Sequence, residues 1–178
     1  ADLTTQTRLT AGADYSERNP KGSMWGALPL FYSDGTQADD LPVSTTTASP
    51  WNRWDRESTN AFVQVEHAFD NGWDVQFDVE RREGKMDGYL LYFSGFPDKE
   101  TGKGLGTSPN HYVADREQTS VRFLASGPFE LFGREHQLTA GALHSKQTVD
   151  SVSYGTNDPI VVPSIFDWGN GVEPVDFN

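Results

Sequence analysis

The sequence predicts an all-β protein: an antiparallel up-and-down meander of five strands. Three observations support this fold class. Apolar and polar residues alternate with a period of two over several stretches, which is the pattern of a strand with one apolar face. The connections between these stretches alternate between long and short. Aromatic residues make up 12% of a chain that is only 35% hydrophobic, which suits half-exposed strands better than a helical bundle.

The clearest element is a β-hairpin over residues 60–80. Every second residue on each arm is mainly apolar, and most residues between them are acidic or carry amides, so one face is apolar and the other is acidic. Asn71-Gly72 separates the arms and predicts a tight two-residue turn, because this dipeptide adopts the positive φ values that such a turn requires. The apolar positions are Ala61, Val63, Val65, Phe69, Trp73, Val75, Phe77 and Val79.

The same alternation predicts the remaining strands. Short turns and long connections alternate along the chain, and outer-membrane barrels show this asymmetry, with short periplasmic turns and long extracellular loops. A soluble β-sandwich also alternates and uses aromatic residues, so it stays open as an alternative. The predicted strands lie near 4–17, 58–69, 73–83, 112–131 and 136–149, and the long loops are 18–57, 94–110 and 151–178.

Charge and composition exclude several classes of function. Fourteen basic against 26 acidic residues give a net charge of −12, which disfavours nucleic acid as a partner. The absence of cysteine excludes disulfides and a thiolate nucleophile. No run of apolar residues is long enough for a transmembrane helix, and the first residues do not form a signal peptide.

Four long motifs, in order along the chain, carry a resemblance to a known family. They are LTAGADYSERNPKGSMWGALPLFYSDGT, AFVQVEHAFDNGW, FSGFPDKETGKGL and ASGPFELFGREHQLTAGA. With these motifs the chain resembles TonB-dependent ferric-siderophore receptors, and within them the ferric-pyoverdine and ferric-coprogen types. The resemblance covers most of residues 3–150, and residues 151–178 match more loosely.

The resemblance implies a bacterial outer-membrane barrel of about 22 strands, closed by an N-terminal plug domain. Such receptors take up ferric siderophores with energy from the TonB complex, so the implied partners are the chelate, TonB and outer-membrane lipid. No cofactor or resident metal is implied, because iron arrives already chelated, and no enzyme activity is implied. The chain departs from this pattern, since it has five strands and no plug. Unpaired sheet edges cost several kcal/mol or so per backbone group in lipid, so we expect a segment of a longer receptor, 1–178 being one partial barrel domain.

Aromatic residues in the loops are the candidate ligand-binding residues. A ferric siderophore is a bulky polar chelate with flat portions, and stacking faces in an open vestibule suit it. The competing interpretation is that these rings pack a small core of the loop itself or form the upper aromatic girdle. The candidates are Trp25, Tyr32, Trp51 and Trp54 in the first long loop, together with Tyr92.

A few further residues are weaker candidates for the same site. Tyr112 and Trp168 lie in or beside the other long loops. Arg53 and Arg56 offer cations that suit an anionic chelate, although loop arginines are more often simply solvated.

Metal and catalytic signals are weak. The four histidines, at 67, 111, 136 and 144, have no metal-ligand spacing and are interpreted as structural. Asp34 with Asp39-Asp40 lacks a calcium-loop pattern and is interpreted as a solvated acidic loop. The carboxylates of Asp74, Asp78 and Glu80 share a face and resemble a hydrolytic pair, but on a barrel strand they line the polar lumen instead.

Two other functions stay open beside the receptor. One is a soluble β-sandwich that binds carbohydrate through loop tryptophans. The other is a plain diffusion porin, which the aromatic loops, lacking rings of charge, make less favourable.

Overall fold

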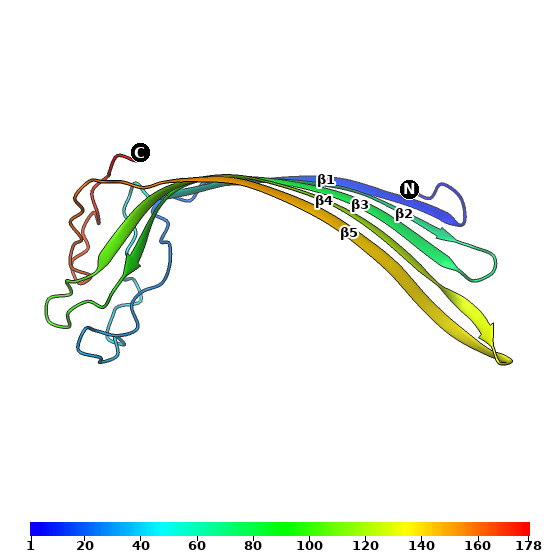
Figure 1. Cartoon of the computed structure of the whole chain (residues 1–178), viewed down its shortest axis with the longest axis horizontal. Helices are drawn as coiled ribbons and strands as arrows, with labels where there is room; N and C mark the ends of the chain where they lie inside the picture. Colours follow the sequence, from blue (N-terminus) through cyan, green and yellow to red (C-terminus); the bar gives the residue numbers. More distant parts are fainter. The chain divides into compact units, whose positions relative to one another are not determined.

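Five strands in one antiparallel sheet make up the fold (Figure 1). The computed structural model describes residues 1–178. Each strand is hydrogen-bonded to the next strand along the chain, so the predicted up-and-down meander is confirmed. No helix is long and apolar enough to cross a membrane. The strands are β1 (Thr7–Arg18), β2 (Arg53–Ala68), β3 (Asp74–Ser94), β4 (Gly106–Leu131) and β5 (Arg134–Tyr154).

The strands extend further into the long connections than alternation alone predicted, whereas β1 begins at residue 7 rather than residue 4. β2 begins at residue 53, β3 continues to residue 94, β4 begins at residue 106, and β5 ends at residue 154. The predicted loops 18–57, 94–110 and 151–178 therefore shrink to the connections 19–52, 95–105 and 155–178. The alternation is lost in these extensions, but backbone pairing continues, because ladder hydrogen bonds do not depend on the side-chain pattern.

The two hairpin turns differ in type. Between β4 and β5, Phe132 and Gly133 both have positive φ, at 55° and 71°, which is the conformation of a two-residue type I′ turn. The prediction of a two-residue turn at Asn71-Gly72 is wrong. Only Gly72 has positive φ there, and its N–H bonds the carbonyl of Phe69 at 3.0 Å, so the turn is longer and ends in a left-handed glycine.

The chain forms two compact units. Unit 1 comprises Ala1–Ser16, Glu57–Lys85 and Asp115–Asp150 and contains both tight turns. Unit 2 comprises Glu17–Arg56, Met86–Ala114 and Ser151–Asn178 and contains the three long connections. The assignment of 1–178 to one partial barrel domain stays a prediction.

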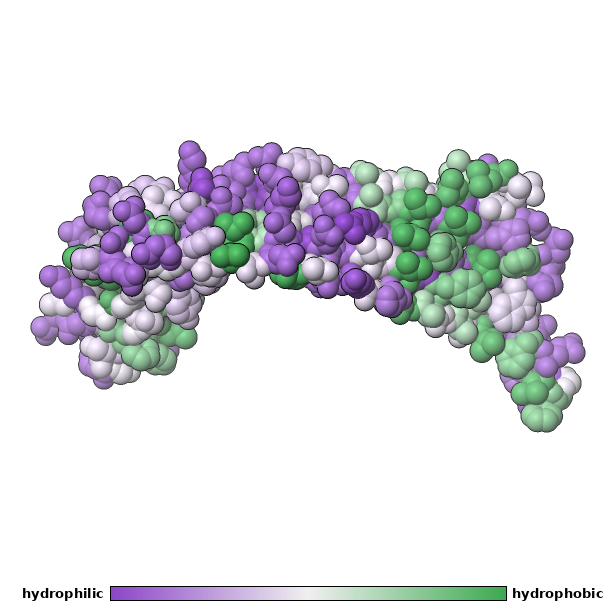
Figure 2. All heavy atoms as spheres, turned by 45° about the horizontal axis from the view of Figure 1, so that its top comes forward, coloured by the Kyte–Doolittle hydropathy of each residue, from purple (hydrophilic) through white to green (hydrophobic).

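One face of unit 1 carries an apolar band. Figure 2 shows hydrophobic residues gathered across its strands, and many of these side chains are exposed. On β4 the band runs from Val121 to Leu131, roughly ten residue steps. At about 3.4 Å a step and a tilt near 45°, that spans about 24 Å, close to the apolar height of outer-membrane barrels. Other band residues are Val63, Val65, Val75, Phe77, Val79, Phe123, Ala125, Phe129, Leu138, Ala140 and Ala142.

The apolar band has sharp limits on the same face. One alternate position beyond Val79, Arg81 forms ion pairs of 2.9 Å with both Glu83 and Glu117. Toward the turns, aromatic rings mark the other limit: Phe69 lies 4.4 Å from the His67 ring, and Phe129 is stacked 5.3 Å from His136. Charges at one limit and rings at the other fit a band that ends at two interfaces.

The opposite face of unit 1 is polar and internally paired. Arg122 donates from Nε to Asp78 at 2.9 Å, and Gln76 donates to the same carboxylate at 2.9 Å. Hydroxyl pairs join β4 to β5, including Ser126 with Thr139 at 2.9 Å. Several polar groups of this face are therefore paired across strands.

Unit 2 has a small core of its own. Hydrogen bonds join the three connections: Trp168 Nε1 donates to Ala48 O at 2.7 Å, Ser33 N donates to Pro97 O at 2.9 Å, and Ile165 N donates to Gly102 O at 2.9 Å. The long connections thus fold as one packed body. The buried hydrophobic residues are Tyr32, Leu90, Leu91, Leu105, Ile165, Trp168 and Val172.

Candidate ligand-binding site

Trp25 lies against two tyrosines of the sheet in unit 2. It forms an isolated parallel bridge with Tyr92, and its ring meets Tyr92 edge-on at 5.7 Å and Tyr112 edge-on at 5.1 Å. Gly26 follows with a φ of +100°, a backbone conformation that favours glycine. The three rings come from the first connection, β3 and β4.

Trp54 occupies the same face from β2. Its Nε1 donates to the Sδ atom of Met86 at 3.0 Å, and the guanidinium carbon of Arg56 lies 3.7 Å above its ring. Gly88 adjoins the indole, since a Cβ there would lie 3.5 Å from Trp54 Cδ1. These contacts hold the indole in one orientation on the sheet.

The register of β3 and β4 places Tyr112 beside the same glycine. Tyr89 and His111 are stacked at 4.0 Å on neighbouring antiparallel strands, so Gly88 lies opposite Tyr112. Gly88 is therefore flanked by Trp54 on β2 and Tyr112 on β4. We call Trp25, Trp54, Tyr92 and Tyr112 the aromatic cradle. Three of these four were among the five predicted ligand residues, and Tyr112 was a weaker candidate.

Tyr32 lies in the packed body of the connections, outside the cradle. It is 1% exposed, and its hydroxyl donates to Asp40 at 2.6 Å. This hydrogen bond, helped by burial, raises the pKa of Tyr32 to about 12. Its ring lies 6.2 Å from Phe166. Tyr32 thus matches the competing interpretation, in which a loop ring packs the loop's own core.

Trp51 and Trp168 are also held by neighbouring loop segments. Trp51 Nε1 donates to Val172 O at 2.7 Å, and its ring lies 6.2 Å from Phe177. Trp168 is 9% exposed and packs edge-on against Phe93 at 5.2 Å. Their indole N–H groups are both used to join the connections.

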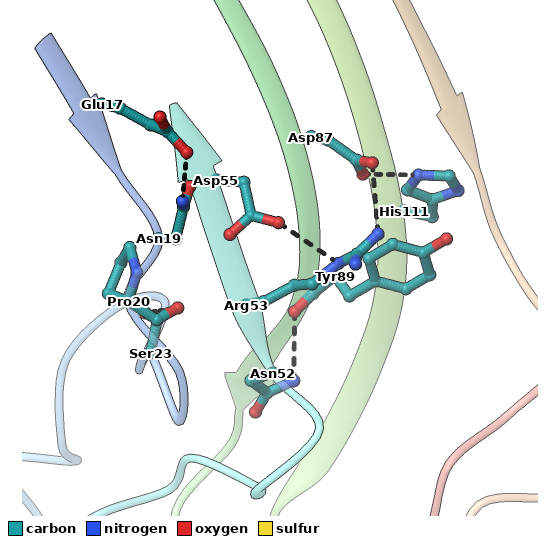
Figure 3. Close-up of polar contacts among 10 residues, drawn as sticks. All are labelled: Glu17, Asn19, Pro20, Ser23, Asn52, Arg53, Asp55, Asp87, Tyr89 and His111. Atoms are coloured by element: carbon teal, nitrogen blue, oxygen red, sulfur yellow. Dashed lines mark hydrogen bonds and ion pairs between the residues drawn. The ribbon is translucent and has the colours of Figure 1, made fainter. Parts of the chain in front are cut away.

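Arg53 belongs to a polar network on the other face of unit 2 (Figure 3). Its Nη2 donates to Asp87 at 3.2 Å, and Asp55 lies 3.6 Å from its Nε. Asp87 also contacts His111 Nε2 at 2.9 Å, and the Arg53 guanidinium lies 4.4 Å above the Tyr89 ring. The carboxylates of Asp55 and Asp87 therefore already balance the positive charge of Arg53. The sequence did not separate Arg53 from Arg56, but period-two alternation puts them on opposite faces.

The acidic residues and histidines do not form a metal centre. No group of three or more His, Asp or Glu side chains is placed to hold an ion. Asp34 accepts hydrogen bonds from the backbone N–H and hydroxyl of Thr36, and these hold its pKa below the usual value. His67 bonds the Thr7 hydroxyl at 2.8 Å. These groups stabilise local structure.

Unit 1 contains a separate groove of about 350 Å³. Polar residues dominate its lining, including Gln6 and Arg8 near the start of the chain and Glu66 on β2. None of the predicted ligand residues lies there. The cradle in unit 2 remains the place where the predicted rings come together.

Comparison with known proteins identifies relatives over most of the chain. No family model matches it. It is 31% identical over 158 residues to the ferripyoverdine receptor of Pseudomonas aeruginosa, covering 86% of this chain and 19% of that receptor. It is 29% identical over 181 residues to the ferric-pyoverdine BN7/BN8 receptor of Pseudomonas putida, covering 97% of this chain and 22% of that receptor.

A solved structure agrees with the sequence comparison. It is the ferripyoverdine receptor of the outer membrane of P. aeruginosa bound to ferripyoverdine, with a TM-score of 0.72 and 30% identity over 86% of this chain and 20% of that chain. The chain spans about a fifth of the length of the curated relatives it matches. Its relatives are thus ferripyoverdine receptors, a group of TonB-dependent outer-membrane receptors, and its sheet is similar to part of their barrel.

Proposed function

We propose that this chain is a segment of an outer-membrane receptor that binds a ferric siderophore of the pyoverdine type. The observation that carries the proposal is the cradle, in which Trp25 packs on Tyr92 and Tyr112, in a chain whose relatives are named for ferric pyoverdines. Uptake is then energised by the TonB complex acting on a plug domain of the longer receptor. The segment contributes binding and barrel wall rather than catalysis.

The cradle has the chemistry that a bulky chelate needs. Tyr92 is 50% exposed, so part of its ring is available for contact. Edge-on packing fixes the rings before a ligand arrives, which lowers the entropy lost on binding. Successive side chains of a strand alternate between its two faces, so residues 54, 86 and 92 point to the same side of their strands as Gln64, Gln76 and Asp78. On a barrel strand, these polar positions face the interior.

The apolar band supports outer-membrane lipid as the second partner. Many of its side chains are exposed in this chain, and its height of about 24 Å fits an outer membrane. The carbohydrate-binding alternative called for two sheets packed face to face, whereas the structure has a single sheet. If the chain, expressed alone, stayed folded and monodisperse without detergent, the membrane proposal would fail.

Replacing Trp25 tests the binding site. In the intact receptor, we expect Trp25→Ala to weaken ferripyoverdine binding about tenfold, or about 1.4 kcal/mol, because the ring that joins Tyr92 to Tyr112 is lost. Binding is measured by fluorescence titration of the purified receptor. Tyr154→Ala is the matched control, since Tyr154 belongs to the aromatic stack around His111, outside the cradle. Equal affinities of the Trp25 variant and the wild type would remove the cradle from the proposal.

A further inference from the structure

Two arginines lie opposite each other on β1 and β2 in unit 2. Trp54 N bonds Pro20 O at 3.3 Å, Gly22 N bonds Asn52 O at 2.7 Å, and Lys21 pairs with Arg53 in an antiparallel bridge. Following this register back along β1 places Arg18 directly opposite Arg56. Directly opposite residues have Cβ atoms about 4.5–5.5 Å apart and point to the same face.

Neither arginine has a carboxylate partner. Both are exposed, and neither takes part in any ion pair of the structure. Five other arginines do, at 2.7–3.6 Å from a carboxylate: Arg8, Arg53, Arg81, Arg82 and Arg122. Like charges directly opposite each other in a sheet are destabilising. The chain has 26 acidic residues, yet none of them pairs with Arg18 or Arg56. The local arrangement therefore leaves two positive charges uncompensated.

This pair adjoins the aromatic cradle. The Arg56 guanidinium lies 3.7 Å above the Trp54 ring, and Trp54 is itself fixed by its hydrogen bond to Met86. Stacking on an indole orients a guanidinium and leaves its N–H edge free to donate. Arg18 and Arg56 share the Trp54 face, because residues 54 and 56 are alternate positions of one strand.

We propose that Arg18 and Arg56 bind an acidic group of the ferric chelate, a carboxylate or a catecholate-type oxygen, while the cradle rings contact its flat part. The inference rests on the proposed function, because it assigns a charge to the ligand of the same site. An anion between the two guanidinium groups relieves their mutual repulsion and accepts charge-assisted hydrogen bonds from both. The pair thus selects for acidic chelates over neutral ones.

The test uses the intact receptor and two probes. The probes are ferripyoverdine and a ferric trihydroxamate chelate that has no acidic side group, each titrated at low and high salt. We expect the double variant Arg18→Gln/Arg56→Gln to weaken ferripyoverdine binding at least tenfold at low salt and to flatten its salt dependence. Arg82→Gln is the matched control, because Arg82 already pairs with Glu80 at 2.7 Å, and its affinity is expected to stay within twofold of the wild type.

Stability measurements separate recognition from a structural role. Removing two facing charges is expected to leave the melting temperature of the receptor unchanged or to raise it, whereas loss of a structural pair lowers it. If the wild type binds ferripyoverdine and the double variant binds it equally well with the same salt dependence, the assignment of these arginines is overturned. If the wild type binds no ferric chelate at all, the proposed function itself fails.

Discussion

The two units bury their apolar side chains in different ways. All seven buried hydrophobic residues belong to unit 2, where the long connections cover one another. Unit 1 has none, although it holds the apolar band, and every residue of β5 is exposed. Strands of one sheet therefore pack against the long connections in unit 2 and carry an exposed apolar face in unit 1. Unit 2 has a core of its own, whereas unit 1 leaves many side chains of its apolar face exposed.

A charge in the apolar band is the strongest test of this difference. Ala125 lies within the band on β4, so Ala125→Arg places a cation where we propose lipid. We expect the intact receptor to lose about 2–4 kcal/mol of folding free energy in lipid vesicles, measured by the folded fraction on gels without heating. Thr119→Arg is the matched control on the same face, beyond the band and beside Arg81, with an expected loss of 1 kcal/mol or so. Equal losses at both positions would contradict a lipid-facing band.

The next largest loss of stability is expected from a substitution in the core of unit 2. Trp168→Ala removes the packing against Phe93 and the hydrogen bond to Ala48, and we expect a local loss of about 3–5 kcal/mol. Faster hydrogen exchange over residues 45–52 and 164–172, with unit 1 unchanged, is the readout. Val161→Ala, at a position that is 83% exposed, is expected to change nothing. Faster exchange throughout both units would show that the core of unit 2 also supports unit 1.

The smallest effect is expected at Tyr32. Tyr32→Phe removes the hydrogen bond to Asp40, and we expect a cost of about 1 kcal/mol, measured by hydrogen exchange in the first connection. Because the pKa of Tyr32 is raised from 10.0 to about 12, its stabilisation is complete below pH 10 and is lost as the pH rises toward 12. Tyrosinate absorbance follows this titration, and a tyrosine that ionises near pH 10 would contradict the buried hydrogen bond.

The candidate site was only partly predictable from the sequence. Indoles and phenols in long loops suit a flat ligand, which drew attention to Trp25, Trp54 and Tyr92, three rings that lie together in the cradle. The same reasoning included Tyr32 and Trp51, because composition cannot distinguish a ring that faces a ligand from a ring that packs a loop. Tyr112 was ranked low, since its neighbour Gly88 becomes meaningful only when the register of β3 and β4 is known.

The hairpins, too, were only partly predictable from the sequence. Both turns were located correctly from Gly72 and Gly133. The type of the turn at Gly72 was not, because a turn type depends on φ at each residue and on hydrogen bonds such as Gly72 N to Phe69 O. Strand ends were underestimated for a related reason, since alternation of apolar residues stops where the backbone ladder continues.

The sequence by itself determined which residues share a face. Period-two alternation assigns Val79 to the apolar band, because successive side chains of any strand point to opposite sides. Only the tertiary structure decided which side chains meet across strands and loops. Trp25 reaches Tyr92, and Arg18 faces Arg56, through a register and a loop path that connect residues far apart in the chain. Long-range pairing of this kind depends on backbone hydrogen bonds, which the order of side chains along one strand does not specify.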